Sequence, residues 1–100
     1  MRPCSQDAET PDPGGDAEVL RLFREGSAGA FEMLFAHYRR PVFDYLYRLV
    51  GRDRGMAEDL LFEVFVKIYD ARASYKPGLR FSSWLFAIAR NHGLNSLQSR

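Results

Sequence analysis

The stretch AFEMLFAHYRRPVFDYLYRLV, residues 30–50, carries the strongest periodic pattern in the chain. Its large apolar side chains recur at spacings of three and four, namely Phe31, Leu34, Phe35, Tyr38, Val42, Tyr45, Leu46 and Leu49. This spacing places them on one face of an amphipathic helix. Pro41 interrupts the pattern. Because proline removes a backbone donor and crowds the preceding turn, we expect a kink or a brief break between Arg39 and Pro41.

Helical patterns also lie on both sides of this stretch. We expect Asp16 to cap a short helix that ends near Gly26, and Ser27 to cap the helix after it. Beyond a turn, an apolar stripe at helical spacing covers residues 56–71, and Asp53 is expected to cap this helix. The middle of the chain therefore consists of consecutive helices with short connections.

The last helix is expected to begin at Phe81, after a loop with a Pro-Gly turn signal, with Ser82 as its N-cap. No alternating strand pattern occurs, so the sequence predicts an all-α fold, a small bundle of about four helices. Residues 1–15 hold several prolines, glycines and acids and almost no large apolar side chains. We expect them to form a disordered tail, and residues 16–100 to form the domain.

The overall composition fits one small domain. The chain has 100 residues, of which 46% are hydrophobic and 14% aromatic. Its single cysteine, Cys4, excludes an intramolecular disulfide and gives no zinc-ligand pattern. No apolar run reaches the length of about eighteen residues that a membrane span needs, and the N-terminus lacks a basic-then-apolar signal. We expect a cytoplasmic protein with no membrane partner.

Catalytic patterns are missing from the sequence. His37 and His92 fall on different predicted helices, and neither has cysteines or clustered carboxylates at ligand spacing. Each is more typical of a surface or boundary histidine than of a metal ligand or a general base. The glycines form no phosphate-binding loop. The sequence therefore predicts no enzyme activity, no cofactor, no metal and no small-molecule substrate.

The basic C-terminal part carries the residues that we interpret as DNA-binding. The formal net charge is only +1, but no acidic residue follows Asp70. Amide side chains can read base edges, cations can bind phosphates, and an aromatic ring can stack on an unpaired base. The candidates are Tyr75, Lys76, Arg80, Trp84, Ala87, Arg90, Asn91 and Asn95. On chemistry alone an alternative stays open, in which Trp84 belongs to the core and the asparagines are ordinary surface residues.

Three segments carry a resemblance to a known family. They are AFEMLF at 30–35 followed by Tyr38, AEDLLFEVF at 57–65, and FSSWLFAIARN at 81–91. Their order and spacing resemble region 2 of the sigma-70 family of RNA polymerase sigma factors, in the extracytoplasmic-function (ECF) group. The resemblance covers about residues 16–100. It implies a DNA-binding subunit of RNA polymerase that acts in transcription initiation and is not an enzyme.

The resemblance implies a polymerase-binding surface on the helix over residues 56–71. In that family the matching helix docks on the clamp helices of the largest subunit of core RNA polymerase, and the implied contacts here are Asp59, Phe62, Glu63 and Val66. The carboxylates can pair with basic groups, and the two apolar side chains offer a contact beside them. Phe62 departs from the family, in which a glutamine is usual. It either alters that contact or marks a surface adapted to a particular partner.

The resemblance also implies how promoter DNA is bound. The loop over residues 73–80 resembles the segment that captures a flipped base of the minus-ten element. The final helix resembles the one that reads and opens that element on the non-template single strand. Asn91 is the implied base contact, and Tyr75 is expected to line the base pocket. Arg80 and Arg90 are expected to meet phosphates.

A further domain belongs to the family pattern. In the family, region 4, a helix-turn-helix that reads the minus-thirty-five element, follows region 2 after a linker. The present sequence stops at Arg100, inside a helical pattern and without a cap. We therefore expect an excised domain, although a divergent short protein is the other possibility.

Two other functions are alternatives to the sigma interpretation. The first is a sigma-like interaction module bound chiefly by a regulatory protein such as an anti-sigma factor, through the same Phe62 and Val66 surface. The second is a repressor-type helix-turn-helix. The connection between Ile68 and Phe81 is much longer than the turn of about three or four residues that this motif requires, so the second interpretation is disfavoured.

Overall fold

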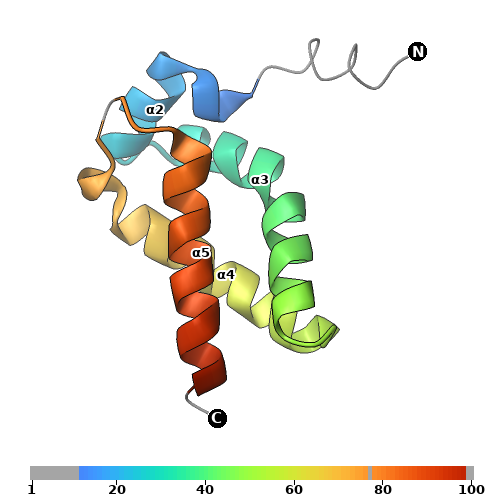
Figure 1. Ribbon diagram of the computed structural model, residues 1–100. Coiled ribbons are helices and arrows are strands. Elements are labelled where there is room, and N and C mark those ends of the chain that lie inside the picture. Colours follow the sequence, from blue (N-terminus) through green and yellow to red (C-terminus); the bar gives the residue numbers. More distant parts are fainter. Residues whose placement is uncertain (1–11, 77, 99–100) are drawn as a thin grey trace.

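The computed structural model describes residues 12–76 and 78–98, which form helices and connecting turns but no strand. The four α-helices are α2 (Ala17–Arg24), α3 (Ala28–Leu49), α4 (Arg54–Asp70) and α5 (Phe81–Gln98) (Figure 1). Two 3-10 turns, η1 (Pro13–Gly15) and η2 (Arg72–Ser74), precede α2 and α5. None of the described helices has both the length and the apolar character needed to cross a membrane. The predicted all-α bundle of about four helices is confirmed.

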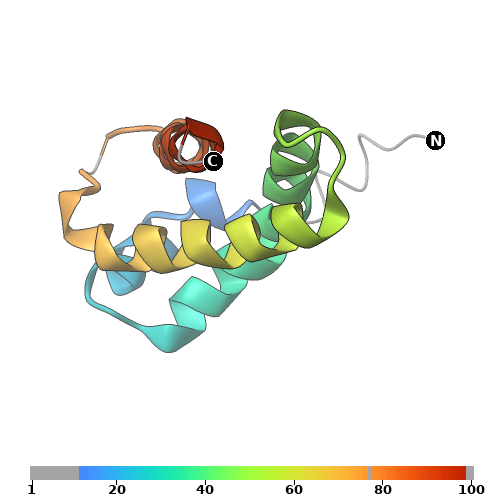
Figure 2. The same cartoon turned by 90° about the horizontal axis from the view of Figure 1, so that it is seen from below.

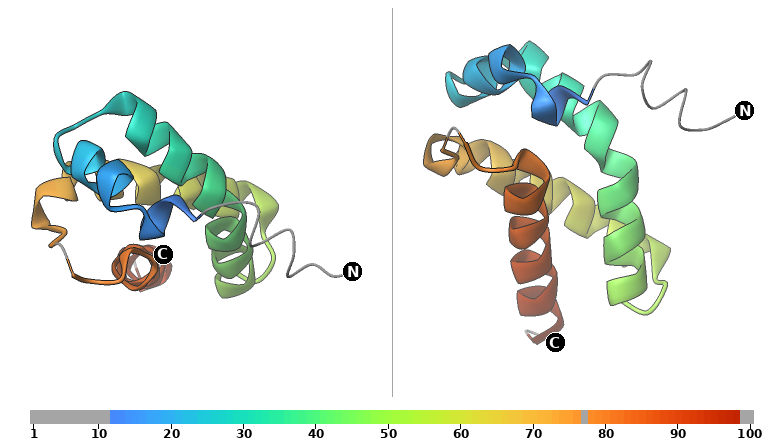
Figure 3. Two further views of the ribbon diagram at one scale, coloured as in Figure 1. Left: turned by 90° about the horizontal axis from the view of Figure 1, so that it is seen from above. Right: turned by 45° about the horizontal axis from the view of Figure 1, so that its top comes forward.

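The helices are arranged around one shared core. Helix α4 runs back along α3, and α5 crosses α4 (Figures 1 and 2). Helix α2 and η1 lie against the first half of α3, next to the loop that leads into α5 (Figure 3). Figure 2 views α5 along its axis and places the second half of α3 beside it. This arrangement leaves one long side of both α4 and α5 available to partners.

Local capping signals determine where the first three helices begin. The carboxylate of Asp16 accepts hydrogen bonds from two backbone N–H groups in the first turn of α2. The hydroxyl of Ser27 accepts from the backbone N–H of Ala30 at 3.2 Å, and the carboxylate of Asp53 accepts from that of Met56 at 3.1 Å. These bonds satisfy donors that have no partner inside the helix. All three predicted caps are confirmed.

Helix α5 begins without the predicted cap. Ser82 lies inside the first turn, because the helix already starts at Phe81. The backbone N–H of Trp84 donates to the carbonyl of Arg80 at 3.2 Å, so Arg80 takes the place directly before the helix. The prediction that Ser82 is the N-cap is therefore wrong.

The expected disordered tail ends earlier than predicted. Residues 13–15 form η1, which packs on α2, α3 and α5, and Pro13 is buried. Asp12 fixes this turn, since its carboxylate accepts hydrogen bonds from the Gly14 N–H at 2.8 Å and from the Tyr38 hydroxyl at 2.7 Å. The prediction of disorder is wrong for residues 12–15, and residues 1–11 lie outside the described part of the chain.

Helix α3 bends but does not break at Pro41. It remains one helix from Ala28 to Leu49, and Figure 1 shows it changing direction about halfway. Proline has no N–H, so the carbonyl one turn earlier, on His37, loses its usual helical donor. The predicted kink is confirmed and the alternative of a break is not observed. The bend lets the first half of α3 pack on α2 and directs the second half toward α5.

The core is built from aliphatic and aromatic side chains of all four helices. Phe23, Val42, Leu46, Val64 and Leu85 are completely buried. Their burial supplies the main stabilisation of a domain this small.

Helices α3 and α5 approach closely at a glycine. A Cβ atom placed on Gly93 would lie 2.5 Å from Cδ2 of Leu49 and 3.3 Å from Cδ2 of Leu46. The missing side chain therefore lets α5 lie directly against the second half of α3. This contact fixes the position of the C-terminal half of α5, on which the candidates Arg90, Asn91 and Asn95 lie.

Candidate nucleic-acid and protein interfaces

A buried tyrosine anchors the loop between α4 and α5. Tyr75 is 2% exposed, and its ring meets the rings of Phe81 and Trp84 edge-on at centroid distances of 5.6 and 5.3 Å. Its hydroxyl donates a hydrogen bond to the carbonyl of Leu79. Burial raises the pKa of Tyr75, so the hydroxyl stays protonated and able to donate. The residue predicted to line a base pocket thus also holds the loop against α5.

The tip of this loop is exposed. Gly78 has a φ of 98°, a conformation that side chains rarely adopt, and the N–H of Leu79 donates to the carbonyl of Lys76 at 3.1 Å. Lys76, a predicted DNA-binding residue, and Arg80, a predicted phosphate contact, have exposed side chains. Within residues 12–76 and 78–98, no carboxylate lies within ion-pair distance of either one. Both cations are therefore available to an anionic ligand.

A small hollow of about 170 Å³ lies between this loop and α2. Tyr75 and Gly78 line it from the loop, and Leu20, Arg21 and Arg24 line it from α2. Arg21 already pairs with Glu18 in α2 and with Glu25 directly after it. No residue of α2 belongs to the predicted DNA-binding set. The spacing of Leu20 and Arg24, one helical turn apart, shows that they share a face but does not reveal what that face meets.

Trp84 is held in place by three other rings. Its centroid lies 6.3 Å from that of Phe23, 5.3 Å from that of Tyr75 and 5.7 Å from that of Phe81. The side chain is half-buried. Trp84 therefore belongs largely to the core, as the alternative interpretation held, and only part of it borders the outer face of α5.

The outer face of α5 brings the remaining candidates together. Ala87, Asn91 and Asn95 recur every four residues along one face, Arg90 adjoins them, and all four are exposed. None of the carboxylates in the described residues lies within ion-pair distance of Arg90. This surface combines amide groups with unpaired positive charge, which are the groups that contact bases and phosphates.

The predicted protein contacts form a ridge on α4. The exposed fractions of Phe62 and Val66 are 66% and 59%, and Asp59 and Glu63 are exposed beside them. Large apolar side chains this exposed are typical of surfaces that bind another protein. We call these four residues the α4 ridge.

One member of the α4 ridge already has a partner within the chain. Oε1 of Glu63 lies 2.7 Å from Nε2 of His92 on α5. The sequence predicted a surface or boundary position for His92, and no local pattern indicates this contact. Across the described residues, no group of three or more His, Cys, Asp or Glu side chains could hold a metal ion. The contact between Glu63 and His92 joins α4 to α5.

Two curated proteins show what the chain is similar to. It is 42% identical over 79 residues to RNA polymerase sigma factor CarQ of Myxococcus xanthus, a match that covers 79% of this chain and 45% of CarQ. It is 30% identical over 82 residues to the ECF RNA polymerase sigma-E factor of Escherichia coli strain K12, covering 82% of this chain and 42% of that protein. The chain spans less than half the length of these relatives.

A solved structure and a family model agree with these matches. The fold matches an NMR structure of an engineered region 2 of sigmaE in complex with GTAAAA, with a TM-score of 0.77 and 28% sequence identity. The match covers 91% of this chain and 90% of that chain. The family model for Sigma-70 region 2 matches residues 34–100, which is more than half of the sequence. The predicted family is thereby confirmed, and the chain belongs to the Sigma-70 region 2 family.

Proposed function

We propose that this domain binds core RNA polymerase and recognises and opens the minus-ten promoter element in transcription initiation, without catalysing a reaction itself. The observation that carries the proposal is the fold shared with a sigmaE region 2 domain in complex with GTAAAA. The unpaired cations of the loop and of α5 support it. So does the lack of any acidic residue after Asp70, because carboxylates there would repel the DNA backbone.

In this proposal the outer face of α5 reads the promoter strand. The amide of Asn91 contacts a base edge, because an amide both donates and accepts hydrogen bonds. Asn95 extends the same face by one turn, and Ala87 leaves room for the strand to approach. Arg90 binds phosphate beside them, and Arg80 does so where the helix begins.

The hollow between the loop and α2 is proposed to receive an unpaired base. Tyr75 gives it an aromatic wall fixed by packing, and Leu20 gives it an apolar one. Lys76 holds the strand at the loop tip. Removing a base from the stack costs about a few kcal/mol, which the binding energy of the separated strand offsets. Promoter opening then needs no hydrolysis.

The α4 ridge is proposed to bind the clamp helices of the largest polymerase subunit. Asp59 and Glu63 pair with basic groups there, while Phe62 and Val66 supply the apolar contact. This ridge and the outer face of α5 consist of different residues, so polymerase and DNA bind at the same time.

A second protein is a candidate ligand of the α4 ridge. The exposed Phe62 and Val66 would also be available to a regulatory protein of the anti-sigma type, which would compete with polymerase for the α4 ridge. Such a protein would act as an inhibitor of the function proposed here. Displacement of the domain from core polymerase by that protein, lost in Phe62→Ala, is the result that would establish it.

The proposed function is tested by binding of the domain to purified bacterial core polymerase, followed by addition of single strands that include GTAAAA. Asp59→Ala is expected to weaken polymerase binding, and Asn91→Ala to weaken strand binding by the polymerase complex. Glu32→Ala on α3 and Gln98→Ala at the end of α5 are the matched controls, because both side chains are exposed and lie outside the proposed surfaces. No polymerase binding by the folded wild-type domain would overturn the proposal.

A further inference from the structure

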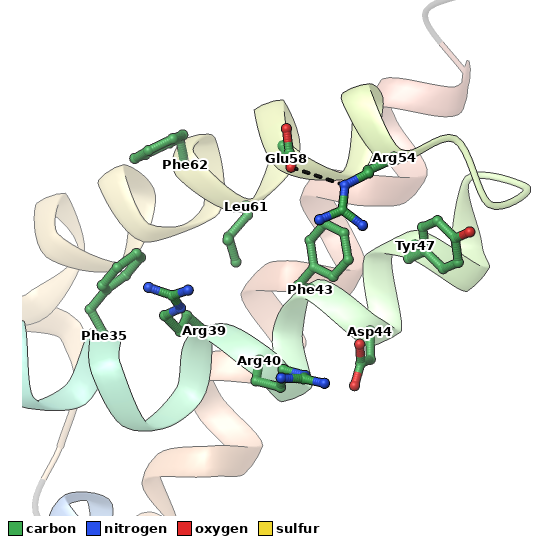
Figure 4. Close-up of a pocket in the computed structure, with 10 residues that line it drawn as sticks. All are labelled: Phe35, Arg39, Arg40, Phe43, Asp44, Tyr47, Arg54, Glu58, Leu61 and Phe62. Atoms are coloured by element: carbon green, nitrogen blue, oxygen red, sulfur yellow. Dashed lines mark ion pairs between the residues drawn. The ribbon is translucent and has the colours of Figure 1, made fainter.

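A groove of about 660 Å³ lies between α3 and α4, and Phe62 of the α4 ridge is one of the residues that line it (Figure 4). The groove therefore extends the α4 ridge. Among the described residues that line the groove, none belongs to η1 or to α2. The contacts of η1 thus concern a different part of the molecule, and no interface proposed for protein or DNA includes them.

The carboxylate of Asp12 is the centre of the contacts that hold η1. Its Oδ1 atom accepts hydrogen bonds from the Gly14 N–H at 2.8 Å and from the Tyr38 hydroxyl at 2.7 Å, and it lies 3.5 Å from Nε2 of His37. Tyr38 and His37 belong to α3, so one carboxylate attaches η1 to that helix. The turn also packs on α2 and on α5 (Figure 3).

The close approach of η1 to α3 requires a glycine at position 14. A Cβ atom on Gly14 would overlap the hydroxyl of Tyr38, which is only 5% exposed and has little room to move. A Cβ atom on Gly15, in the same turn, would meet no other described residue within 4 Å apart from its chain neighbours. Alanine at position 14 is therefore expected to separate Tyr38 from η1, whereas alanine at position 15 is expected to leave the contact intact.

The ring of Tyr38 connects this contact to the loop before α5. Its centroid lies 5.5 Å from that of Phe81, the first residue of α5, and the centroid of Phe81 lies 5.6 Å from that of Tyr75. Phe81 and Tyr75 are 1% and 2% exposed. We call these three buried rings the ring row. In a close-packed interior a ring cannot shift without moving its neighbours, so the position of Tyr75 depends on that of Tyr38.

We propose that Asp12 is a positioning residue for strand binding, and that it holds Tyr75 in place through the ring of Tyr38. Tyr75 is the aromatic wall of the hollow between the loop and α2, so this role rests on the function proposed for that hollow. Asp12 is not among the described residues that line the hollow, and it acts only through the ring row. Without the bond to Asp12, the wall is no longer preformed. Ordering it then opposes binding of the base and lowers the affinity.

The test measures binding of a single strand that includes GTAAAA to the complex of the full chain with core polymerase. Asp12→Ala and Gly14→Ala are each expected to weaken strand binding about two- to tenfold, which corresponds to the net free energy of one hydrogen bond. Asp12→Asn should keep most of the affinity, because its amide oxygen can still accept from the Tyr38 hydroxyl. Gly15→Ala is the matched control and should bind like the wild type.

Two further measurements separate positioning from a general loss of stability. In strands that lack one base at a time, the loss caused by Asp12→Ala should disappear when the base that enters the hollow is removed, and it should persist at the other positions. A smaller folded fraction would instead weaken every strand alike. Trp84, the single tryptophan, contacts the ring of Tyr75, so its indole N–H resonance reports on the ring row without DNA. This resonance should shift in Asp12→Ala and Gly14→Ala but not in Gly15→Ala.

The results that would contradict this role differ from those that would contradict the proposed function. Wild-type affinity in both Asp12→Ala and Gly14→Ala, an equal loss in Gly15→Ala, or an equal loss for every strand would overturn the positioning role alone. So would an unchanged Trp84 resonance in Asp12→Ala. No strand binding by the wild-type complex would overturn the function proposed for the hollow, and the positioning role with it.

Discussion

Nε2 of His92 lies 2.7 Å from Oε1 of Glu63, and this contact joins α5 to α4. His92 follows Asn91, the proposed base contact, whereas Glu63 belongs to the α4 ridge. The side chain of His92 is 16% exposed and that of Glu63 is 55% exposed, so a partner can reach the carboxylate while the imidazole stays mostly covered. One hydrogen bond therefore links the α4 ridge to the residue that follows the proposed base contact.

We predict that His92→Ala and Glu63→Ala each lower the free energy of unfolding by about 0.5–1.5 kcal/mol, the net contribution of one hydrogen bond. The double variant should lose less than the sum of the two, because both changes remove the same contact. Urea denaturation of the four proteins measures this coupling, with Glu32→Ala as an exposed control. Strictly additive losses would mean that the contact contributes nothing to stability.

A second prediction concerns alkaline pH. Burial, reinforced by the hydrogen bond to Asp12 and by its charge, raises the pKa of Tyr38 well above its usual value, and burial also raises that of Tyr75. A tyrosine in the unfolded chain loses its proton at about pH 10, whereas Tyr38 and Tyr75 keep theirs in the folded protein. The folded state then binds more protons, so stability is fully present below about pH 10 and falls as the pH rises beyond it.

Tyr38→Phe should make this fall shallower, because phenylalanine has no proton to lose, at the cost of about 1 kcal/mol at neutral pH from the lost hydrogen bond. Tyr75→Phe should also reduce the slope of the unfolding free energy against pH. Urea denaturation at a series of pH values from about 9 to 11 measures both effects. A slope identical in all three proteins would show that neither hydroxyl titrates differently on folding.

The sequence predicted those parts of the fold that depend on neighbouring residues. Asp16, Ser27 and Asp53 cap their helices as expected, because a cap acts over about three residues and its pattern is visible locally. The bend at Pro41 is local for the same reason. The family segments then supplied the order of the helices and the positions of the proposed interfaces.

Features that depend on long-range contacts escaped prediction. The η1 turn is held by a bond from Tyr38 to Asp12, 26 residues away in sequence, and so looked like part of a disordered tail. The burial of Tyr75 depends on rings of α5, and the bond between His92 and Glu63 spans 29 residues. Composition and periodicity report burial along one element. They do not report which two elements meet.

A third prediction compares two glycines at the start of α3. Gly26 has a φ of 95°, and its carbonyl accepts a hydrogen bond from the Tyr69 hydroxyl at 3.1 Å. Gly26→Ala should destabilise the domain by about 1–2 kcal/mol, because an L side chain is strained in this conformation. Gly29 is exposed in the first turn of α3, and only Ser27 Oγ, at 3.8 Å, would lie near a Cβ atom there.

Gly29→Ala should therefore stabilise the domain by about 0.5–1 kcal/mol, through the lower backbone entropy of alanine in the unfolded state. Thermal denaturation separates the two variants, since each kcal/mol shifts the Tm of a domain this size by about 4–8 °C. Equal effects of the two changes would show that the positive φ at Gly26 is not what the site requires.

The last prediction separates two neighbouring residues of α5 by the kind of DNA contact that is proposed for each. Arg90→Ala should weaken binding of the polymerase complex to every single strand alike, and it should lower the salt dependence by about 0.7 in the slope of log K against log salt, because one phosphate contact is lost. Asn91→Ala should leave the salt slope unchanged and remove discrimination worth about 1–3 kcal/mol at one base position.

Fluorescence anisotropy with a panel of single strands that differ from GTAAAA by one base, measured at several salt concentrations, distinguishes these outcomes. If Asn91 reads a base edge, its variant loses the preference at one position and keeps the others, whereas the Arg90 variant keeps the whole ranking at lower affinity. A uniform loss in Asn91→Ala would instead place that amide on the backbone. Base reading by α5 would then have to come from Asn95, one turn further along the same exposed face, and Asn95→Ala should remove the preference that Asn91→Ala left intact.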